Sequence, residues 1–260
     1  MKTQEKTVTE LLKNKVALIT GGNSGIGKAI SIRAASEGAK IVIGARDEKT
    51  GKETVDYISS KGGEAFFIRA DMSDPKQIDS LFEKTIEKYG EVDLACNNSA
   101  TGGPQLPIHE IDSDIWNHMM SVNLTAPFLC MKHEIQHMLS KGGGSIVNMS
   151  SANGLIGTKG FTTYTANKHG LNGLTKSAAL DYADKGIRIN AVCPGGVETP
   201  MFNQTYGKNS EAWKKARDFH PIKQLGTPES IAGLVTFLWS DASSYVTGSC
   251  LSIDGALTAQ

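Results

Sequence analysis

The chain has 260 residues, and its 27 lysines and arginines balance 27 aspartates and glutamates, so the formal net charge is zero. This balance argues against nucleic-acid binding, which uses a basic surface. No apolar run approaches the roughly 18 residues of a membrane span, and the polar N-terminus lacks the apolar stretch of a signal peptide. Four widely spaced cysteines without CxxC pairing indicate reduced thiols. We therefore expect a cytoplasmic protein that binds neither membranes nor nucleic acid.

Short apolar runs alternate with helical segments along the chain. Their near-continuous apolar character is typical of strands that are covered on both faces. The predicted strands are residues 15–20, 40–45, 65–70, 92–97, 145–150, 187–193 and 249–254. Asp74-Pro75 and Thr227-Pro228 each place an N-cap residue before a proline suited to a first helical position. The alternation predicts an α/β fold with a parallel sheet of about seven strands and helices on both faces.

A glycine-rich segment follows the first predicted strand. Gly21, Gly25 and Gly27 precede a predicted helix. Glycines let the backbone approach a phosphate closely, and the helix N-terminus offers N–H groups and partial positive charge. The spacing differs from GxGxxG, so a glycine-rich turn that binds nothing is the alternative interpretation. The position directly after the first strand favours a nucleotide site.

Tyr164 and Lys168 lie one helical turn apart in a predicted helix, on the same face. A free tyrosine has a pKa near ~10, and a nearby ammonium group lowers the pKa of a phenol. The pair is therefore a candidate proton donor and acceptor for an alcohol or carbonyl. An ordinary tyrosine–lysine pair on an amphipathic helix is the alternative.

Taken together, these motifs closely resemble the short-chain dehydrogenase/reductase family over about residues 12–256. The family's NNAG segment corresponds to Asn97-Asn98-Ser99-Ala100, and its serine, thirteen residues before the tyrosine, corresponds to Ser151. The upstream asparagine corresponds to Asn123, and the PGxVxT segment to residues 194–199. The resemblance implies a single Rossmann-type, doubly wound domain over residues 1–260, of which residues 1–14 form an N-terminal extension. It also implies an enzyme that transfers a hydride between a nicotinamide cofactor and a carbonyl or secondary alcohol.

The resemblance also implies a role for each of four catalytic residues. Tyr164 exchanges a proton with the substrate oxygen, and Ser151 donates a hydrogen bond to that oxygen. Lys168 lowers the pKa of Tyr164 and binds the nicotinamide ribose. Asn123 holds a water molecule that links Lys168 to solvent.

The cofactor site implied by the family is formed by loops that follow the strands. It includes the glycine loop, the segments after the fourth and sixth strands, and residues that follow the second and third strands. Its residues are Gly21, Asn23, Ser24, Gly25, Ile26, Gly27, Arg46, Asp71, Met72, Asn98, Ser99, Ala100, Tyr164, Lys168, Pro194, Gly195, Val197 and Thr199. Relatives that use NAD carry an aspartate where this chain has Ala45, and Arg46 could pair with a 2′-phosphate, so we expect NADP(H) in preference to NAD(H). Asp47 is an alternative ribose ligand, although its position favours a helix cap.

Two positions depart from the family pattern. Ala100 replaces the last glycine of NNAG, where an added methyl group puts cofactor affinity in question. Ala256 replaces the last glycine of a terminal DGG, and we expect an effect on the tail alone.

The segment at about 200–225 mixes aromatic and charged residues and is predicted to form a substrate lid. The candidate substrate-contacting residues are Ala152, Asn153, Gly196, Met201 and Phe202. We expect a small neutral ketone or secondary alcohol as substrate, with 3-oxoacyl-[acyl-carrier-protein] reduction as the alternative. The resemblance implies a homotetramer built from helices at about 112–140 and 162–183 and the last strand.

His133-Glu134-Ile135-Gln136-His137 matches the HExxH pattern of zinc hydrolases. The third histidine of the longer motif is missing, because position 143 is glycine. We therefore favour an incidental histidine pair and predict no metal site. A cofactor-binding regulator without turnover is a third possibility, and the complete set of four catalytic residues argues against it.

Overall fold

The strands of the protein form one parallel sheet. The computed structural model describes residues 10–259, and within them seven strands pair in the order β3-β2-β1-β4-β5-β6-β7. They are β1 (Val16–Thr20), β2 (Lys40–Ala45), β3 (Glu64–Arg69), β4 (Leu94–Asn97), β5 (Gly144–Met149), β6 (Ile187–Pro194) and β7 (Cys250–Ile253). Each begins and ends within two residues of its expected range. The expected Rossmann-type sheet is confirmed.

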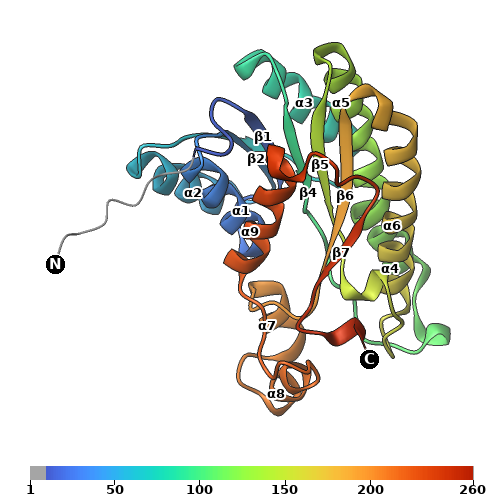
Figure 1. Ribbon diagram of the computed structural model, residues 1–260. Coiled ribbons are helices and arrows are strands. Elements are labelled where there is room, and N and C mark those ends of the chain that lie inside the picture. The colour runs from blue at the N-terminus through green and yellow to red at the C-terminus, as the bar shows by residue number, and fades with distance from the viewer. Residues whose placement is uncertain (1–9, 260) are drawn as a thin grey trace.

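Helices cover both faces of the sheet (Figure 1). They are α1 (Gly25–Ser36), α2 (Glu48–Ser60), α3 (Pro75–Tyr89), α4 (Ser113–Met120), α5 (Ala126–Lys141), α6 (Thr162–Tyr182), α7 (Pro200–Tyr206), α8 (Glu211–Asp218) and α9 (Pro228–Trp239). Neighbouring residues of a strand point to opposite faces. Ala17 and Ile19 therefore pack in one core with α1 and α9, while Val16 and Leu18 pack in a second core with α3 and α5.

Helix starts follow the expected capping residues. The carboxylate of Asp74 accepts a hydrogen bond from Lys76 N, and the hydroxyl of Thr227 accepts one from Ser230 N. Asp47 caps α2, because its carboxylate accepts from Thr50 N at 3.1 Å. The cap interpretation of Asp47 is thus confirmed.

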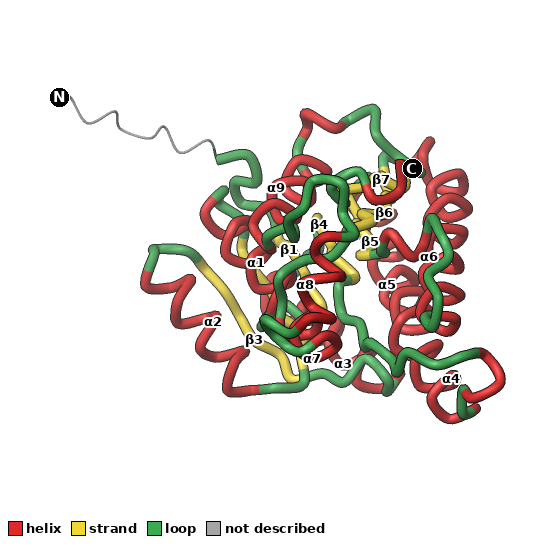
Figure 2. Tube along the Cα trace, turned by 90° about the horizontal axis from the view of Figure 1, so that it is seen from below, coloured by secondary structure: helices red, strands yellow, loops and turns green. Residues whose placement is uncertain are grey.

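The loops that follow the strands meet at one edge of the sheet. Between β1 and β4 the chain order reverses, which is the place where doubly wound sheets bind ligands. Seen from below in Figure 2, α7 and α8 lie over this edge. Within residues 10–259, no helix combines the length and apolar content that crossing a membrane requires.

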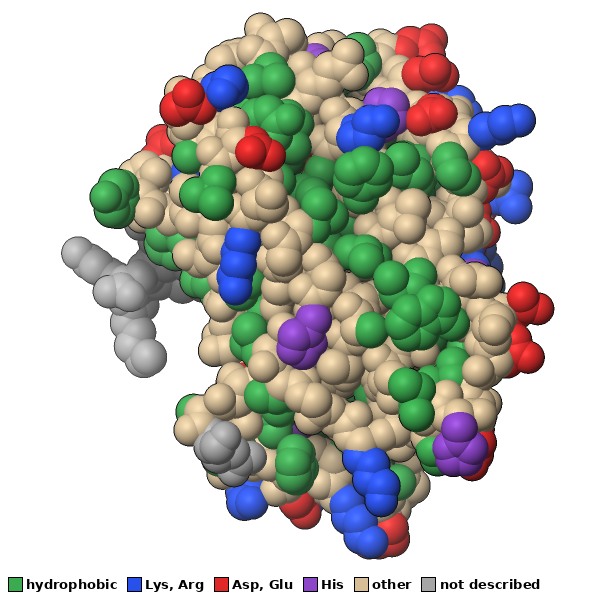
Figure 3. All heavy atoms as spheres, turned by 90° about the vertical axis from the view of Figure 1, so that its right-hand side faces the viewer, with side chains coloured by type: hydrophobic (Ala, Val, Ile, Leu, Met, Phe, Trp, Pro, Cys, Tyr) green, Lys and Arg blue, Asp and Glu red, His purple; other side chains and the backbone are tan. Residues whose placement is uncertain are grey.

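The face built by α4, α5 and α6 carries exposed apolar side chains. Figure 3 shows several hydrophobic side chains gathered there. Trp116, Phe128 and Leu180 are among the exposed large hydrophobic residues of these helices. A shallow apolar groove between α5 and α6 is lined by Leu124, Phe128, Gly170, Gly173 and Leu174, among others.

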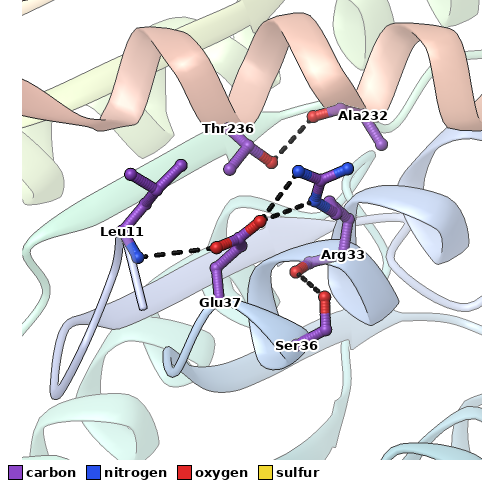
Figure 4. Close-up of polar contacts among 6 residues, drawn as sticks. All are labelled: Leu11, Arg33, Ser36, Glu37, Ala232 and Thr236. Atoms are coloured by element: carbon purple, nitrogen blue, oxygen red, sulfur yellow. Dashed lines mark hydrogen bonds and ion pairs between the residues drawn. The ribbon is translucent and has the colours of Figure 1, made fainter. Parts of the chain in front are cut away.

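The segment before β1 packs against the end of α1. Leu12 is 1% exposed, and its N–H donates to Glu37 O at 3.0 Å. The buried carboxylate of Glu37 pairs with Arg33 at 2.8 Å and accepts from Leu11 N at 3.5 Å (Figure 4). Residues 10–14 of the expected extension thus contact the end of α1 through the buried Leu12 side chain and the backbone N–H groups of Leu11 and Leu12. Residues 1–9 lie outside the described residues.

Candidate active site

The glycine loop between β1 and α1 is tightly packed. A side chain at Gly27 would clash with the carbonyl oxygen of Gly21, so this position requires glycine. Gly21 also has a φ of 67°, in the left-handed region that glycine adopts freely. Asn98 Nδ2, at the end of β4, donates to Thr20 O at 2.9 Å and to Gly21 O at 3.5 Å. The NNSA segment therefore holds the glycine loop in place.

The N-terminus of α1 points its backbone N–H groups at this loop. Ser24 occupies the N-cap position, and within the described residues its side chain makes no capping hydrogen bond. The first N–H groups of the helix are consequently available to an anion. Ile26 packs against the core, and Asn23 Nδ2 turns toward α2, where it donates to Thr50 Oγ1 at 2.7 Å.

The two departures from the family pattern differ in their backbone conformation. Among residues 10–259, the non-glycine residues with positive φ are Asn14, Asn209, Lys223 and Ala256. Ala100 is absent from this set, so its methyl group causes no backbone strain there. Ala256 has a φ of 68°, and the preceding Gly255 O accepts from Ile222 N in the lid segment. The expectation that Ala256 affects only a tail is wrong, because its turn packs against residues 220–222.

Three of the expected catalytic residues converge where β5 ends and α6 begins. Ser151 follows β5, and its side chain lies close enough to Tyr164, in the first turn of α6, to act on the pKa of that phenol. The ammonium of Lys168 lies 5.5 Å from the centre of the Tyr164 ring and donates to Met149 O at 2.7 Å. The arrangement places two hydroxyl groups and one buried cation side by side.

Burial controls the protonation of this group. It raises the pKa of Tyr164 to about 12, and the hydrogen bond with Ser151 opposes that rise. It lowers the pKa of Lys168 to about 8, since a side chain that is 1% exposed loses hydration of its charge. The family resemblance implies a lowered pKa for Tyr164. In this structure burial outweighs the other influences, and the pKa moves upward.

Asn123 lies on a π-helical turn, Ser121–Thr125, between α4 and α5. Its Oδ1 accepts from Thr101 N at 2.8 Å, and its Nδ2 donates to Thr101 O at 2.9 Å. Both ends of the amide thus hold the loop that follows β4. The expected water-holding role therefore has to use the backbone of Asn123, where the π turn widens the helix.

Arg46 and Asp71 stand at the carboxyl ends of β2 and β3. The Arg46 side chain is 70% exposed, and its Nη1 lies 3.9 Å from Asp71 Oδ2. Burial acts to raise the pKa of Asp71, but hydrogen bonds from Ser73 and the charge of Arg46 bring it below its usual value. The Met72 side chain is buried in the second core, so a contact with cofactor would come from its backbone.

The segment after β6 lies beside the glycine loop. A Cβ at Gly25 would lie 3.4 Å from Thr199 Cγ2, which brings the start of α1 and the PGxVxT segment together. Thr199 Oγ1 also caps α7 by accepting from Phe202 N at 3.2 Å. Val197 is buried and forms a bridge with Gly226.

Sequence reasoning missed His220, which follows α8. Its buried ring accepts a hydrogen bond from Gly196 N through Nε2 at 2.8 Å. Nothing in the local pattern distinguishes this residue from the other five histidines, because the contact joins positions 24 residues apart.

The expected substrate residues divide into two groups. Ala152 and Asn153 lie on a 3-10 turn after β5, where Asn153 Oδ1 accepts from Thr158 Oγ1 at 3.0 Å. Phe202 packs against Tyr206 and Trp213, whereas Met201 is exposed. A small cavity beside Tyr164 was not foreseen, and its lining includes Pro104, Ile111, Ile115, Met119, Phe161 and Tyr164.

The HExxH residues face different surroundings. Glu134 is 1% exposed and accepts from Asn97 Nδ2 at 3.1 Å inside the protein. His133 Nε2 lies 2.9 Å from Asp79 Oδ1, and its ring stacks on Phe82. Across the described part of the chain, no cluster of three or more His, Cys, Asp or Glu residues is arranged to hold a metal ion.

Comparison with known proteins places the chain in a family. A family model described as enoyl-(acyl carrier protein) reductase matches residues 21–258. Cyclohexanol dehydrogenase of Acinetobacter sp. (strain SE19) is 41% identical, over 98% of this chain and 100% of that protein. Cis-4-hydroxycyclohexanecarboxylate dehydrogenase of Sinomonas cyclohexanicum is 37% identical, over 96% and 99%. A crystal structure of an actinorhodin polyketide ketoreductase variant with NADPH superposes with a TM-score of 0.90 at 33% identity, over 95% and 98%. The chain belongs to the short-chain dehydrogenase/reductase family and is an oxidoreductase.

Proposed function

We propose that the protein transfers a hydride between a nicotinamide cofactor and a secondary alcohol or ketone, with Tyr164 as general acid and base. One observation carries this proposal. The hydroxyls of Ser151 and Tyr164 and the ammonium of Lys168 converge at the sheet edge where the glycine loop also lies. Hydrogen-bond donors placed together in this way stabilise the negative charge that develops on a substrate oxygen.

The loops fit a bound dinucleotide. The first turn of α1, free of a side-chain cap, would hold the pyrophosphate, and the glycines let the backbone approach it. The segment 194–199 and Lys168 would border the nicotinamide and its ribose. When bound, the nicotinamide supplies or accepts the hydride.

Tyr164 exchanges the proton with the substrate oxygen. With a pKa of about 12 it is protonated at neutral pH, which suits a donor to the oxygen of a ketone under reduction. Ser151 orients that oxygen through its hydroxyl. Lys168, with a pKa of about 8, carries its charge at neutral pH and makes loss of the Tyr164 proton easier in the oxidative direction.

NADP(H) is the proposed cofactor. Arg46 stands exposed beyond the end of β2, and the buried Ala45 before it offers no carboxylate to a ribose 2′-hydroxyl. A planar guanidinium suits a 2′-phosphate. Asp71 is the competing partner of Arg46, and at 3.9 Å the pair is loosely held.

The proposed substrate is a small neutral secondary alcohol or ketone on a six-membered carbon ring. Two relatives carry cyclohexanol and hydroxycyclohexanecarboxylate in their names. The residues that line the small cavity beside Tyr164 are largely apolar, which favours a neutral apolar substrate. The single domain, the lid at about 200–225 and the homotetramer stay predictions. The tetramer is supported by the exposed apolar side chains of α5 and α6.

The proposal is tested by measuring NADPH-dependent reduction of cyclohexanone and, in a parallel assay, of a 3-oxoacyl thioester of acyl-carrier protein. We expect Tyr164→Phe to lower kcat by roughly a thousandfold or more, because the proton donor is lost. Cofactor affinity, measured by energy transfer from tryptophan, should stay unchanged. Tyr182→Phe, on the same helix, is the matched control and should keep full activity. Retention of most activity by Tyr164→Phe would refute the assignment.

A further inference from the structure

The turn at Gly195 and Gly196 is enclosed by two distant segments. Gly195 N donates to Ile253 O at 3.2 Å, and Gly226 N donates to Gly196 O at 2.9 Å. A Cβ at Gly195 would lie 2.9 Å from His220 Nε2, and one at Gly196 would lie 2.9 Å from His220 Cε1. The imidazole therefore fills the space that both glycines leave open.

The contacts of the ring determine its proton arrangement. A backbone N–H can only donate, so Nε2 must be the unprotonated, accepting nitrogen in its 2.8 Å contact with Gly196 N. Nδ1 lies 3.0 Å from Ala216 O and 3.3 Å from Arg217 O, and carbonyl oxygens only accept. Nδ1 must therefore carry the proton. A second proton, on Nε2, would face the Gly196 N–H and break that hydrogen bond.

The neighbouring charged groups have other partners. The carboxylate of Asp254 accepts from Ala256 N, Thr258 N and Thr258 Oγ1. Arg217 pairs with the side chain of Asp218, and Lys223 Nζ donates to Asp218 O at 2.8 Å. The loop after β6 contributes only glycine backbone to the ring. The ring is 5% exposed and joins the end of α8 to the segment beside the nicotinamide position.

We propose that His220 is a positioning residue of the cofactor site: its Nε2 accepts a hydrogen bond from the Gly196 N–H and thereby fixes the segment 194–199. The inference rests on the proposed function, since that segment borders the nicotinamide there. It couples the position of the lid helices to cofactor binding, because His220 is also bound to the last turn of α8.

A pair of variants of nearly equal shape tests this proposal. Glutamine in His220→Gln keeps an accepting oxygen at the reach of Nε2, whereas methionine in His220→Met has a similar length and no comparable acceptor. For each protein we would measure NADPH and NADH affinity by tryptophan energy transfer, together with ketone-reduction kinetics, at neutral pH. Thermal unfolding shows whether each variant is folded.

At neutral pH we expect His220→Met to bind cofactor roughly tenfold more weakly, because it leaves a buried N–H without a partner. Its kcat should change far less than its cofactor KM. His220→Gln should bind within about twofold of wild type, as one acceptor replaces another.

Equal affinity of the two variants would overturn the hydrogen-bond assignment. If His220→Met does not fold, His220→Gln still tests the assignment, because cofactor binding far more than about twofold weaker than wild type would contradict the replacement of one acceptor by another. A wild-type protein that binds neither NADPH nor NADH would refute the proposed function and this inference together, whereas normal wild-type binding with no variant effect refutes the inference alone.

Discussion

Glu134 offers a stability test that follows from its burial. Its side chain lies between α5 and the sheet, is 1% exposed, and accepts a hydrogen bond from Asn97 Nδ2 at 3.1 Å. Burial raises the pKa of this carboxyl to about 8, and the hydrogen bond from Asn97 offsets only part of the rise. In the unfolded chain the ordinary value of 4.5 applies.

The sign of the effect follows from proton binding. Between pH 4.5 and about 8, Glu134 holds a proton in the folded protein and has lost it in the unfolded chain. Its contribution to stability is therefore complete below pH 4.5 and is lost as pH rises toward 8. The loss amounts to about 1.4 kcal/mol per pH unit, or roughly 3 kcal/mol between about pH 5 and pH 7.

Glu134→Gln removes this titration and keeps an oxygen that accepts from Asn97. We expect the variant to gain roughly 3 kcal/mol over wild type as pH rises from about 5 to about 7. Urea unfolding at one protein concentration gives both free energies. The exposed Glu53 provides a control, and Glu53→Gln should follow the wild-type pH dependence. A difference between Glu134→Gln and wild type that does not change with pH would refute the reasoning.

Two further substitutions test the cofactor site and the C-terminal turn. Arg46→Ala should weaken NADPH binding by roughly ten- to a hundredfold, because a charge-assisted contact with the 2′-phosphate is lost. NADH affinity should stay the same. An equal change for both cofactors in tryptophan energy-transfer titrations would contradict the assignment of Arg46. Ala256→Gly should raise the free energy of unfolding by up to about 1 kcal/mol, because the φ of 68° is strained for alanine and not for glycine. A lowered midpoint in urea unfolding would contradict the strain at Ala256.

Local patterns in the sequence were sufficient for the sheet, the helix caps and the family. The apolar runs predicted every strand of the described sheet because buried parallel strands need continuous apolar residues. Asp74 and Thr227 cap α3 and α9 because the capping contact reaches only two or three residues along the chain. Ser151, Tyr164 and Lys168 were predicted from the spacing of the family's motif, and their catalytic roles stay predictions.

Tertiary packing decided the rest, because burial and contacts between distant segments leave no local pattern. Two hydrogen bonds each join residues more than twenty positions apart: one between Thr101 and Asn123, and one between Gly196 and His220. The pKa of Tyr164 moves upward because the folded protein removes its phenol from water, and the spacing to Lys168 could not show this. Glu134 resembled a zinc-site base in sequence, and its burial beside Asn97 makes it a carboxyl with a raised pKa. The sequence determined which chemical groups are present near the site, whereas only the folded structure determined their partners and their protonation.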